Sequence, residues 1–119
     1  MIRAKVVVIS DDFGAGIGVE CYRTTPPDVR EVYYIASIYV DRFVLHAEGI
    51  RIAIQQLRAE YGKCELCVKT PHAGGAFQAQ RKVKDAKIRA DSRRKSVYSD
   101  TALLAEDAIK RRTTITERL

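Results

Sequence analysis

No stretch of the sequence is apolar over the roughly 20 residues that a membrane-spanning helix needs. The opening segment, MIRAKVVVIS, is too short and too soon followed by Asp11 and Asp12 to be a signal peptide, and it predicts a first strand instead. We therefore expect a soluble, cytoplasmic protein with no membrane partner.

Cysteine and histidine are scarce, with three and two residues respectively. An odd number of cysteines does not make a disulfide scaffold, and reduced cysteines indicate a cytosol-like compartment. Cys64 and Cys67 form a CxxC motif, but KCELCVK has strand character, and positions three apart on a strand point to opposite faces. A zinc site would need further ligands, and Cys21, His46 and His72 show no matching spacing. Two histidines also give no readable catalytic triad.

Positive charge is what the chain has in excess. It holds 21 Lys and Arg against 15 Asp and Glu, for a formal net charge of +6. Residues 81–95 hold eight basic and two acidic residues, an excess equal to the whole net charge. Such a segment favours nucleic acid or another phosphate-rich ligand, and a solvated helix face is the alternative. Its basic residues are Arg81, Lys82, Lys84, Lys87, Arg89, Arg93, Arg94 and Lys95.

Length and composition predict one domain. A chain of 119 residues matches the usual domain size of about 100–150 residues, and a 46% hydrophobic content provides for a core. We expect a single α/β domain over residues 1–112 and a flexible tail over residues 113–119.

The first part of the chain predicts a three-stranded antiparallel meander. The β-branched run at residues 5–10 is typical of a buried central strand, and residues 11–14 supply a turn. Residues 16–23 show the side-chain alternation and the β-forming residues that are typical of a second strand. Residues 24–28 contain two prolines and must form a loop, after which residues 30–39 predict a third strand.

A helix follows, because the spacing of apolar residues changes from two to three or four. Its apolar stripe consists of Phe43, Ala47, Ile50, Ile54, Leu57 and Tyr61. Asp41 suits the N-cap and Gly62 suits the C-terminal end. Residues 63–69 predict a strand that is reached directly from a helix and therefore lies parallel to the first strand.

The last third of the chain predicts a glycine-containing loop at residues 71–76, a helix at residues 77–89 and a loop at residues 91–95. Ser99 opens a final helix. The basic residues of its last turn, which suit the helix dipole, are Lys110, Arg111 and Arg112. The complete order predicts an α/β (α+β) fold: a mixed sheet with a meander, a crossover helix, a parallel fourth strand and C-terminal helices.

This order and two motifs resemble the ribonuclease H-like superfamily. In VVVISDDFGAGIGVECYR, Asp11 stands where that family has its first metal-binding aspartate. In HAEGIRIAIQQLRAEYG, Glu48 stands where the family's helix carries a glutamate. The resemblance covers residues 4–70, and it implies that Asp11 and Glu48 are the catalytic and metal-binding residues, with Mg²⁺ or Mn²⁺ as cofactor.

The chain departs from that family at two acidic positions. Thr70 stands at the strand end where the family has an aspartate, and the last helix offers Asp100 or Asp107, neither in clear register. Two-metal hydrolysis needs carboxylates from several elements. The resemblance therefore predicts the fold, with a non-catalytic or weakly catalytic site.

The segment LRAEYGKCELCVKTPHAGGAFQAQRKV resembles the ribosomal small-subunit S-eleven type of protein, whose loop and tail lie against ribosomal RNA. Independently of this resemblance, Gly74 and Gly75 would let backbone N–H groups approach a phosphate. Phe77 could stack on a base. The alternative is a mobile connecting loop with a solvated His72 and with Phe77 in the core.

The acidic residues also have purely structural interpretations. Asp11 and Asp12 can cap their own backbone at the turn. Glu48 can form a salt bridge to Arg42 or Arg51.

Several functions remain open. The leading hypothesis is a non-catalytic or weakly catalytic nucleic-acid-binding module whose phosphate contacts come from residues 81–95 and 110–112. A Mg²⁺- or Mn²⁺-dependent nuclease using Asp11 and Glu48 is the first alternative. A homo-oligomer that binds a nucleotide-like ligand at residues 71–77 is the second. An assembly role is also open, because a third strand with Tyr33, Tyr34 and Tyr39 could be an exposed edge that pairs with a copy of itself.

Overall fold

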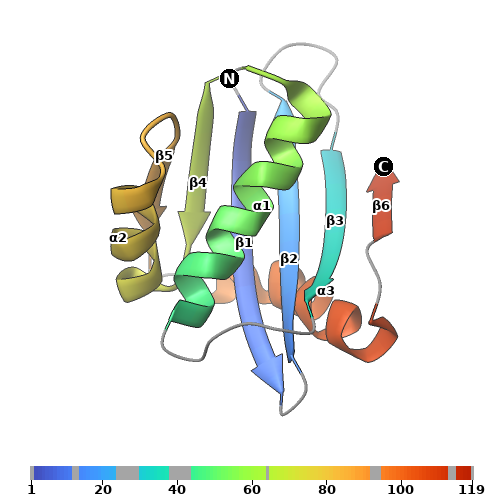
Figure 1. Cartoon of the computed structure of the whole chain (residues 1–119). Coiled ribbons are helices and arrows are strands. Elements are labelled where there is room, and N and C mark those ends of the chain that lie inside the picture. Colours follow the sequence, from blue (N-terminus) through green and yellow to red (C-terminus); the bar gives the residue numbers. More distant parts are fainter. Residues whose placement is uncertain are drawn as a thin grey trace.

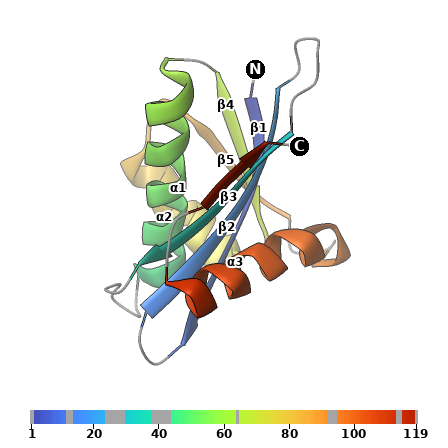
Figure 2. The same ribbon diagram turned by 90° about the vertical axis from the view of Figure 1, so that its right-hand side faces the viewer.

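A mixed sheet forms the middle layer of the molecule, with helices α1 (Leu45–Tyr61) and α2 (Ala73–Lys82) on one side and helix α3 (Ser99–Arg111) on the other (Figures 1 and 2). The computed structural model describes residues 2–11, 14–23, 30–37, 44–63, 65–91, 95–112 and 115–118. For residues 11, 23, 30–37, 95–96 and 115–118 it describes the backbone alone.

Six strands of the described residues lie in the order β5-β4-β1-β2-β3-β6. They are β1 Ile2–Asp11, β2 Gly14–Arg23, β3 Arg30–Ser37, β4 Leu66–Thr70, β5 Lys87–Ala90 and β6 Ile115–Arg118. Strands β1, β2 and β3 pair antiparallel, and β4 lies parallel to β1 with Lys69 beside Lys5. The predicted fold class is therefore confirmed.

Helix α1 packs on β1 and β2 through the predicted apolar stripe. An added Cβ on Gly49 would lie 2.4 Å from the Val8 side chain, so the helix approaches the strand closely. The helix is capped at its C-terminal end by Gly62, whose φ of 69° favours glycine and whose N–H donates to the Arg58 carbonyl at 2.9 Å. The predicted N-cap, Asp41, lies outside the described residues. The buried members of the stripe are Ala47, Ile50, Ile54 and Leu57.

Helix α3 packs on the other face, over β1, β2 and β3. Its backbone lies directly on two glycines of β2. An added Cβ would lie 2.1 Å from the Thr101 carbonyl oxygen at Gly18, and 2.1 Å from the Ala105 carbonyl oxygen at Gly16. Thr101 Oγ1 donates a 2.7 Å hydrogen bond to the buried carboxyl group of Glu20. No helix in the described part of the chain is long and apolar enough to cross a membrane.

Three predictions for the last third of the chain are wrong. Helix α2 begins at Ala73, inside the predicted loop. Residues 87–89 of the predicted helix instead belong to β5, because Ile88 is buried beside Val68 of β4 while its neighbours stay exposed, which is the alternation of a strand. Residues 115–118 of the predicted tail form β6.

Strand β6 also corrects the predicted exposed edge at the third strand. It pairs antiparallel with β3 from Glu31 to Tyr34, so Tyr33 and Tyr34 lie on a strand with a neighbour on each side. Tyr39 lies outside the described residues. The tyrosines of β3 therefore do not mark a free sheet edge.

Candidate functional site

The carboxylate of Glu48, near the start of α1, is held by Arg51. It accepts hydrogen bonds from Arg51 Nε at 3.1 and 3.2 Å and forms an ion pair with Arg51 Nη2. The hydrogen bond from Arg51 lowers the pKa of Glu48. The salt bridge that the sequence offered as an alternative is confirmed. Asp11 ends β1 opposite Gly14, and its side chain lies outside the description.

The other predicted acidic positions form no metal-binding cluster with Glu48 among the described side chains. Thr70 is fully buried at the end of β4, where its Oγ1 accepts a 3.4 Å hydrogen bond from the His72 N–H. Asp100 and Asp107 lie on α3, across the sheet from Glu48 (Figure 2). No group of three or more His, Cys, Asp or Glu side chains within the described ranges could hold a metal ion. Because two-metal hydrolysis needs carboxylates from several elements, the described residues do not fit a Mg²⁺ or Mn²⁺ pair.

Two histidines meet at the end of β4. The rings of His46 and His72 stack with centroids 3.8 Å apart and an interplanar angle of 16°. His72 Nε2 accepts a 3.0 Å hydrogen bond from the Val8 N–H, so the ring continues the pairing of β1 beyond Thr70. Burial, helped by His46, lowers the pKa of His72 to about 4, and burial also lowers the pKa of His46. Ring nitrogens bind metals in the ring plane, so two parallel stacked rings close the strand end and do not share an ion.

The glycines that were predicted to approach a phosphate lie in the first turn of α2. Gly75 is buried, and an added Cβ would lie 2.5 Å from the Cβ of His46, so this glycine lets α2 pack against α1. Gly74 has open space around its Cα. Phe77 is 67% exposed and does not belong to the core. Gly75 thus lies in the contact between α2 and α1, whereas Gly74 and Phe77 lie at the surface.

The basic segment 81–95 is divided between two faces of the molecule. Arg81 and Lys82 line a cavity of about 340 Å³ between α1 and α2. Lys87 and Arg89 emerge from β5 on the opposite side of the sheet, because Ile88 between them faces the core. The described residues of the basic segment therefore do not form one continuous positive face.

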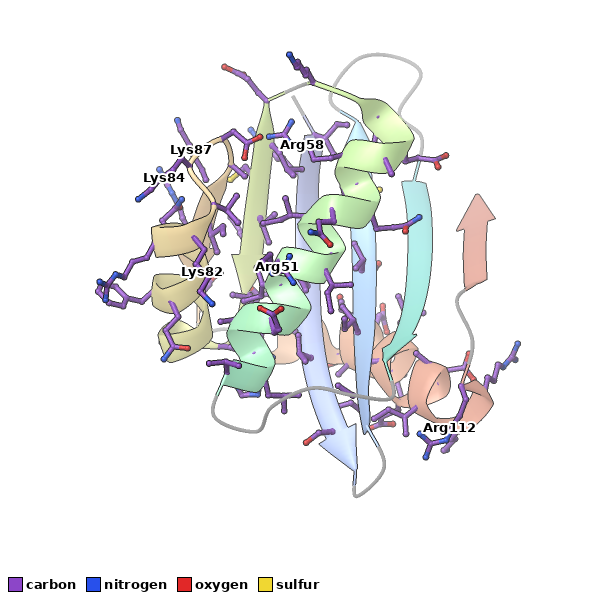
Figure 3. All side chains as sticks on the ribbon, viewed as in Figure 1. Arg51, Arg58, Lys82, Lys84, Lys87 and Arg112 are labelled. Carbon is purple, nitrogen blue, oxygen red and sulfur yellow. The ribbon has the colours of Figure 1, made fainter. Side chains whose placement is uncertain are left out.

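The remaining predicted basic residues in the described part of the chain come from other elements. Lys84 lies in the turn that leads to β5, and Figure 3 shows it close to Lys87. Lys110 and Arg111 end α3, and Arg112 follows at the far corner of the molecule (Figure 3). Three predicted contacts lie outside the description, namely Arg93, Arg94 and the side chain of Lys95.

Two side chains fix the turn between α2 and β5. The amide of Gln80 donates to two carbonyls of the turn at 2.8 and 2.9 Å, and its oxygen accepts from the Ile88 N–H at 2.7 Å. Arg58 of α1 donates to the Asp85 carbonyl at 2.6 Å and pairs with its carboxylate at 3.3 Å. Strand β5 is thus held in register, and Asp85 pairs with an arginine outside the basic segment.

A groove of about 460 Å³ lies on the α3 side of the sheet, with β1, β4 and β5 as its floor. The parallel register places Lys69 beside both Lys5 and Arg89 in one row, and it aligns Arg3 with Lys87 in the next row. The short helix η2 (Lys95–Tyr98) forms part of the wall. The wall residues are Tyr22, Val97, Tyr98 and Asp91, the last being the single carboxylate among the described residues of the lining.

The cations of this groove are weakly neutralised. Lys5 Nζ donates to the Val97 carbonyl at 3.2 Å and lies 5.9 Å from the centroid of the Tyr22 ring. The other four are exposed, and within the described part of the chain none of them forms a hydrogen bond or ion pair through its side chain. These four are Arg3, Lys69, Lys87 and Arg89.

Three of these five cations were not predicted as site residues. Arg3 and Lys5 are two positions apart, as are Lys87 and Arg89, and this is the period of one strand face. The spacing is the signal that could have drawn attention to them. It does not reveal that Lys69 lies between the two pairs, because that depends on which strands are neighbours.

No protein-family model and no curated protein matches the chain. Among solved structures, the chain is similar to LC11-RNase H1, crystallised in complex with an RNA/DNA hybrid. The identity is 15%, the similarity covers 93% of this chain and 98% of that chain, and the TM-score is 0.68. At this identity the similarity concerns the fold alone. The chain therefore has a ribonuclease H-like fold.

Proposed function

We propose that the chain binds nucleic acid and cleaves it weakly or not at all. The observation that carries the proposal is the set of five cations on the face of β1, β4 and β5, against one carboxylate among the described residues of the groove. Contacts from Lys and Arg to phosphates supply most of the sequence-independent affinity of proteins for nucleic acid. The shared fold with LC11-RNase H1, whose structure contains an RNA/DNA hybrid, supports the same class of ligand.

The chemistry of the acidic positions supports weak or absent catalysis. Thr70 offers a neutral oxygen where a hard cation prefers a charged one, and Glu48 is already paired with Arg51. We expect no appreciable cleavage of any nucleic acid in Mg²⁺ or Mn²⁺. Cleavage that Asp11→Asn abolishes would instead establish a metal-dependent nuclease.

Direct binding tests the proposal. Fluorescence anisotropy with labelled single-stranded DNA, single-stranded RNA, duplexes and an RNA/DNA hybrid at about 50 mM salt should show binding that weakens at about 200 mM salt. If none of these forms binds detectably at the lower salt concentration, the proposal is wrong.

A further inference from the structure

Sheet geometry arranges the five cations of the groove as a grid. Neighbouring strands lie about 4.8 Å apart, and alternate residues along one strand lie about 6.6 Å apart. Lys5, Lys69 and Arg89 therefore form one row about 10 Å long, and Arg3 and Lys87 stand in the next row. All five line the same groove.

The longer row is unfavourable in the free protein. Like charges directly opposite each other on neighbouring strands destabilise a sheet, and Lys69 has one on each side. A phosphate chain lying along the rows would relieve this repulsion and release counterions. The row thus opposes the stability of the free fold and favours a bound polyanion.

Tyr22 adds an aromatic surface beside the cations. It lies opposite Arg3 in the β1–β2 ladder, and its hydroxyl donates to Glu20 at 3.3 Å, which orients the ring. A positive groove with an aromatic side chain is the combination that binds single strands with little sequence preference, because any base can stack on the ring. Tyr98 is only 3% exposed and therefore belongs to the wall.

The shape of the groove distinguishes one strand from two. Helix η2 rises on one side of the floor and is tied to it by the bond between Lys5 and the Val97 carbonyl. A volume of about 460 Å³ is in the range of small-ligand sites, roughly 300–1,000 Å³. A segment of one strand fits such a space, whereas a duplex would rest on the rims with most phosphates away from the floor.

We infer that the β1–β4–β5 groove is a channel for a single strand of DNA or RNA, an inference that rests on the proposed function. Its phosphates lie along the two rows of cations, and a base stacks on Tyr22. The surface formed by Arg81 and Lys82 across the sheet takes no part in this contact.

Charge-matched double variants on the two faces test the inference. Lys87→Gln/Arg89→Gln removes two charges from the groove, and Arg81→Gln/Lys82→Gln removes two from the α2 face. Binding of a labelled single-stranded oligonucleotide is measured by anisotropy between about 50 and 200 mM salt. Each phosphate contact contributes about −0.7 to the log–log salt slope of single strands, so the groove variant should lose about 1.4 of that slope. The α2 variant should bind as the wild type does.

Two further variants separate binding from structure. Tyr22→Leu should weaken binding about 5-fold or more through lost stacking, whereas Tyr22→Phe keeps the ring and should bind normally. Lys69→Gln should lower affinity without lowering the unfolding temperature of the free protein, because it removes repulsion. If Lys69 had a purely structural role, its substitution would not lower the affinity while leaving the unfolding temperature undiminished.

The outcomes are distinguishable. If the α2 variant loses as much affinity as the groove variant, or if duplexes and hybrids bind more tightly than single strands, the inference is wrong and the proposed function stands. If AMP or ATP competes as strongly as the oligonucleotide, the groove is a nucleotide site and the inference is again wrong. If no nucleic acid binds at all, both proposals fail.

Discussion

Gly18→Ala tests the contact that positions α3 on the sheet. The added methyl would lie 2.1 Å from the Thr101 carbonyl oxygen and 2.8 Å from the Ala105 nitrogen. Both are backbone atoms, which cannot rotate away. Since Cβ contacts under 3.0 Å essentially do not occur, α3 must retreat by at least 0.9 Å, the difference between 2.1 and 3.0 Å.

This retreat also breaks the hydrogen bond between Thr101 and Glu20. Its length of 2.7 Å would become 3.6 Å after a shift of 0.9 Å, which is no longer a hydrogen bond. Overpacking costs about 1–3 kcal/mol, and a buried hydrogen bond to a carboxyl group contributes about 1–3 kcal/mol. We therefore expect the free energy of unfolding to fall by about 2–6 kcal/mol, a large part of the roughly 5–15 kcal/mol of a typical domain.

Urea unfolding followed by far-UV circular dichroism measures this loss. Gly74→Ala is the matched control, because nothing lies within 4 Å of the added Cβ. An alanine in α2 should stabilise the protein by about 0.5–1 kcal/mol. Thr101→Val alone should also destabilise, and its effect should largely disappear in the Gly18→Ala background, where the bond is already broken. A loss under about 1 kcal/mol for Gly18→Ala, or strict additivity of the pair, would refute the reasoning.

Three further predictions concern the histidine pair and the groove. As the pH falls from 6.5 to about 4, His72 becomes protonated in the unfolded chain before it does in the folded chain, and this destabilises the folded protein. With solvent screening allowed for, the wild type should therefore lose about 1–2 kcal/mol more unfolding free energy over this range than His72→Gln does. Parallel pH profiles of the two proteins in urea unfolding would contradict this. Gln80→Met removes the hydrogen bonds that hold β5 and should weaken single-strand binding in the anisotropy assay, while unchanged affinity would show that β5 keeps its place without them. In a Cys64→Ser background, a bound oligonucleotide should slow labelling of Cys67, which lines the groove, and an unchanged rate would place the strand elsewhere.

Local patterns predict most of the fold. Within residues 5–10, Val6, Val7 and Val8 follow one another with no polar residue between them, and the structure buries all three between two layers of helix. The α1 stripe shows the helical period directly. In contrast, β5 has only Ile88 as a buried apolar residue, and its strand conformation depends on β4 and on the distant Gln80. No local pattern encodes such tertiary pairing.

The cations of the groove likewise depend on tertiary pairing that the sequence does not display. Arg3 and Lys69 are far apart in the sequence, and only the parallel pairing of β1 with β4 makes them neighbours. Conversely, Lys82 and Lys87 are close in the sequence, yet Lys82 ends α2 on one side of the sheet and the pleat of β5 turns Lys87 to the other side. A count of charges along the chain therefore predicts the class of ligand without locating the surface. The likeness to the ribosomal S-eleven type of protein stays a prediction.

The pairing of β6 with β3 has a practical consequence for anyone who shortens this chain. Removal of residues 115–118 would strip four consecutive residues of β3, from Glu31 to Tyr34, of their neighbour. The bare N–H and C=O groups would then offer a template for another molecule. Dimers or aggregates seen only after such trimming would be products of the trimming, and they would say nothing about how many copies the intact protein assembles.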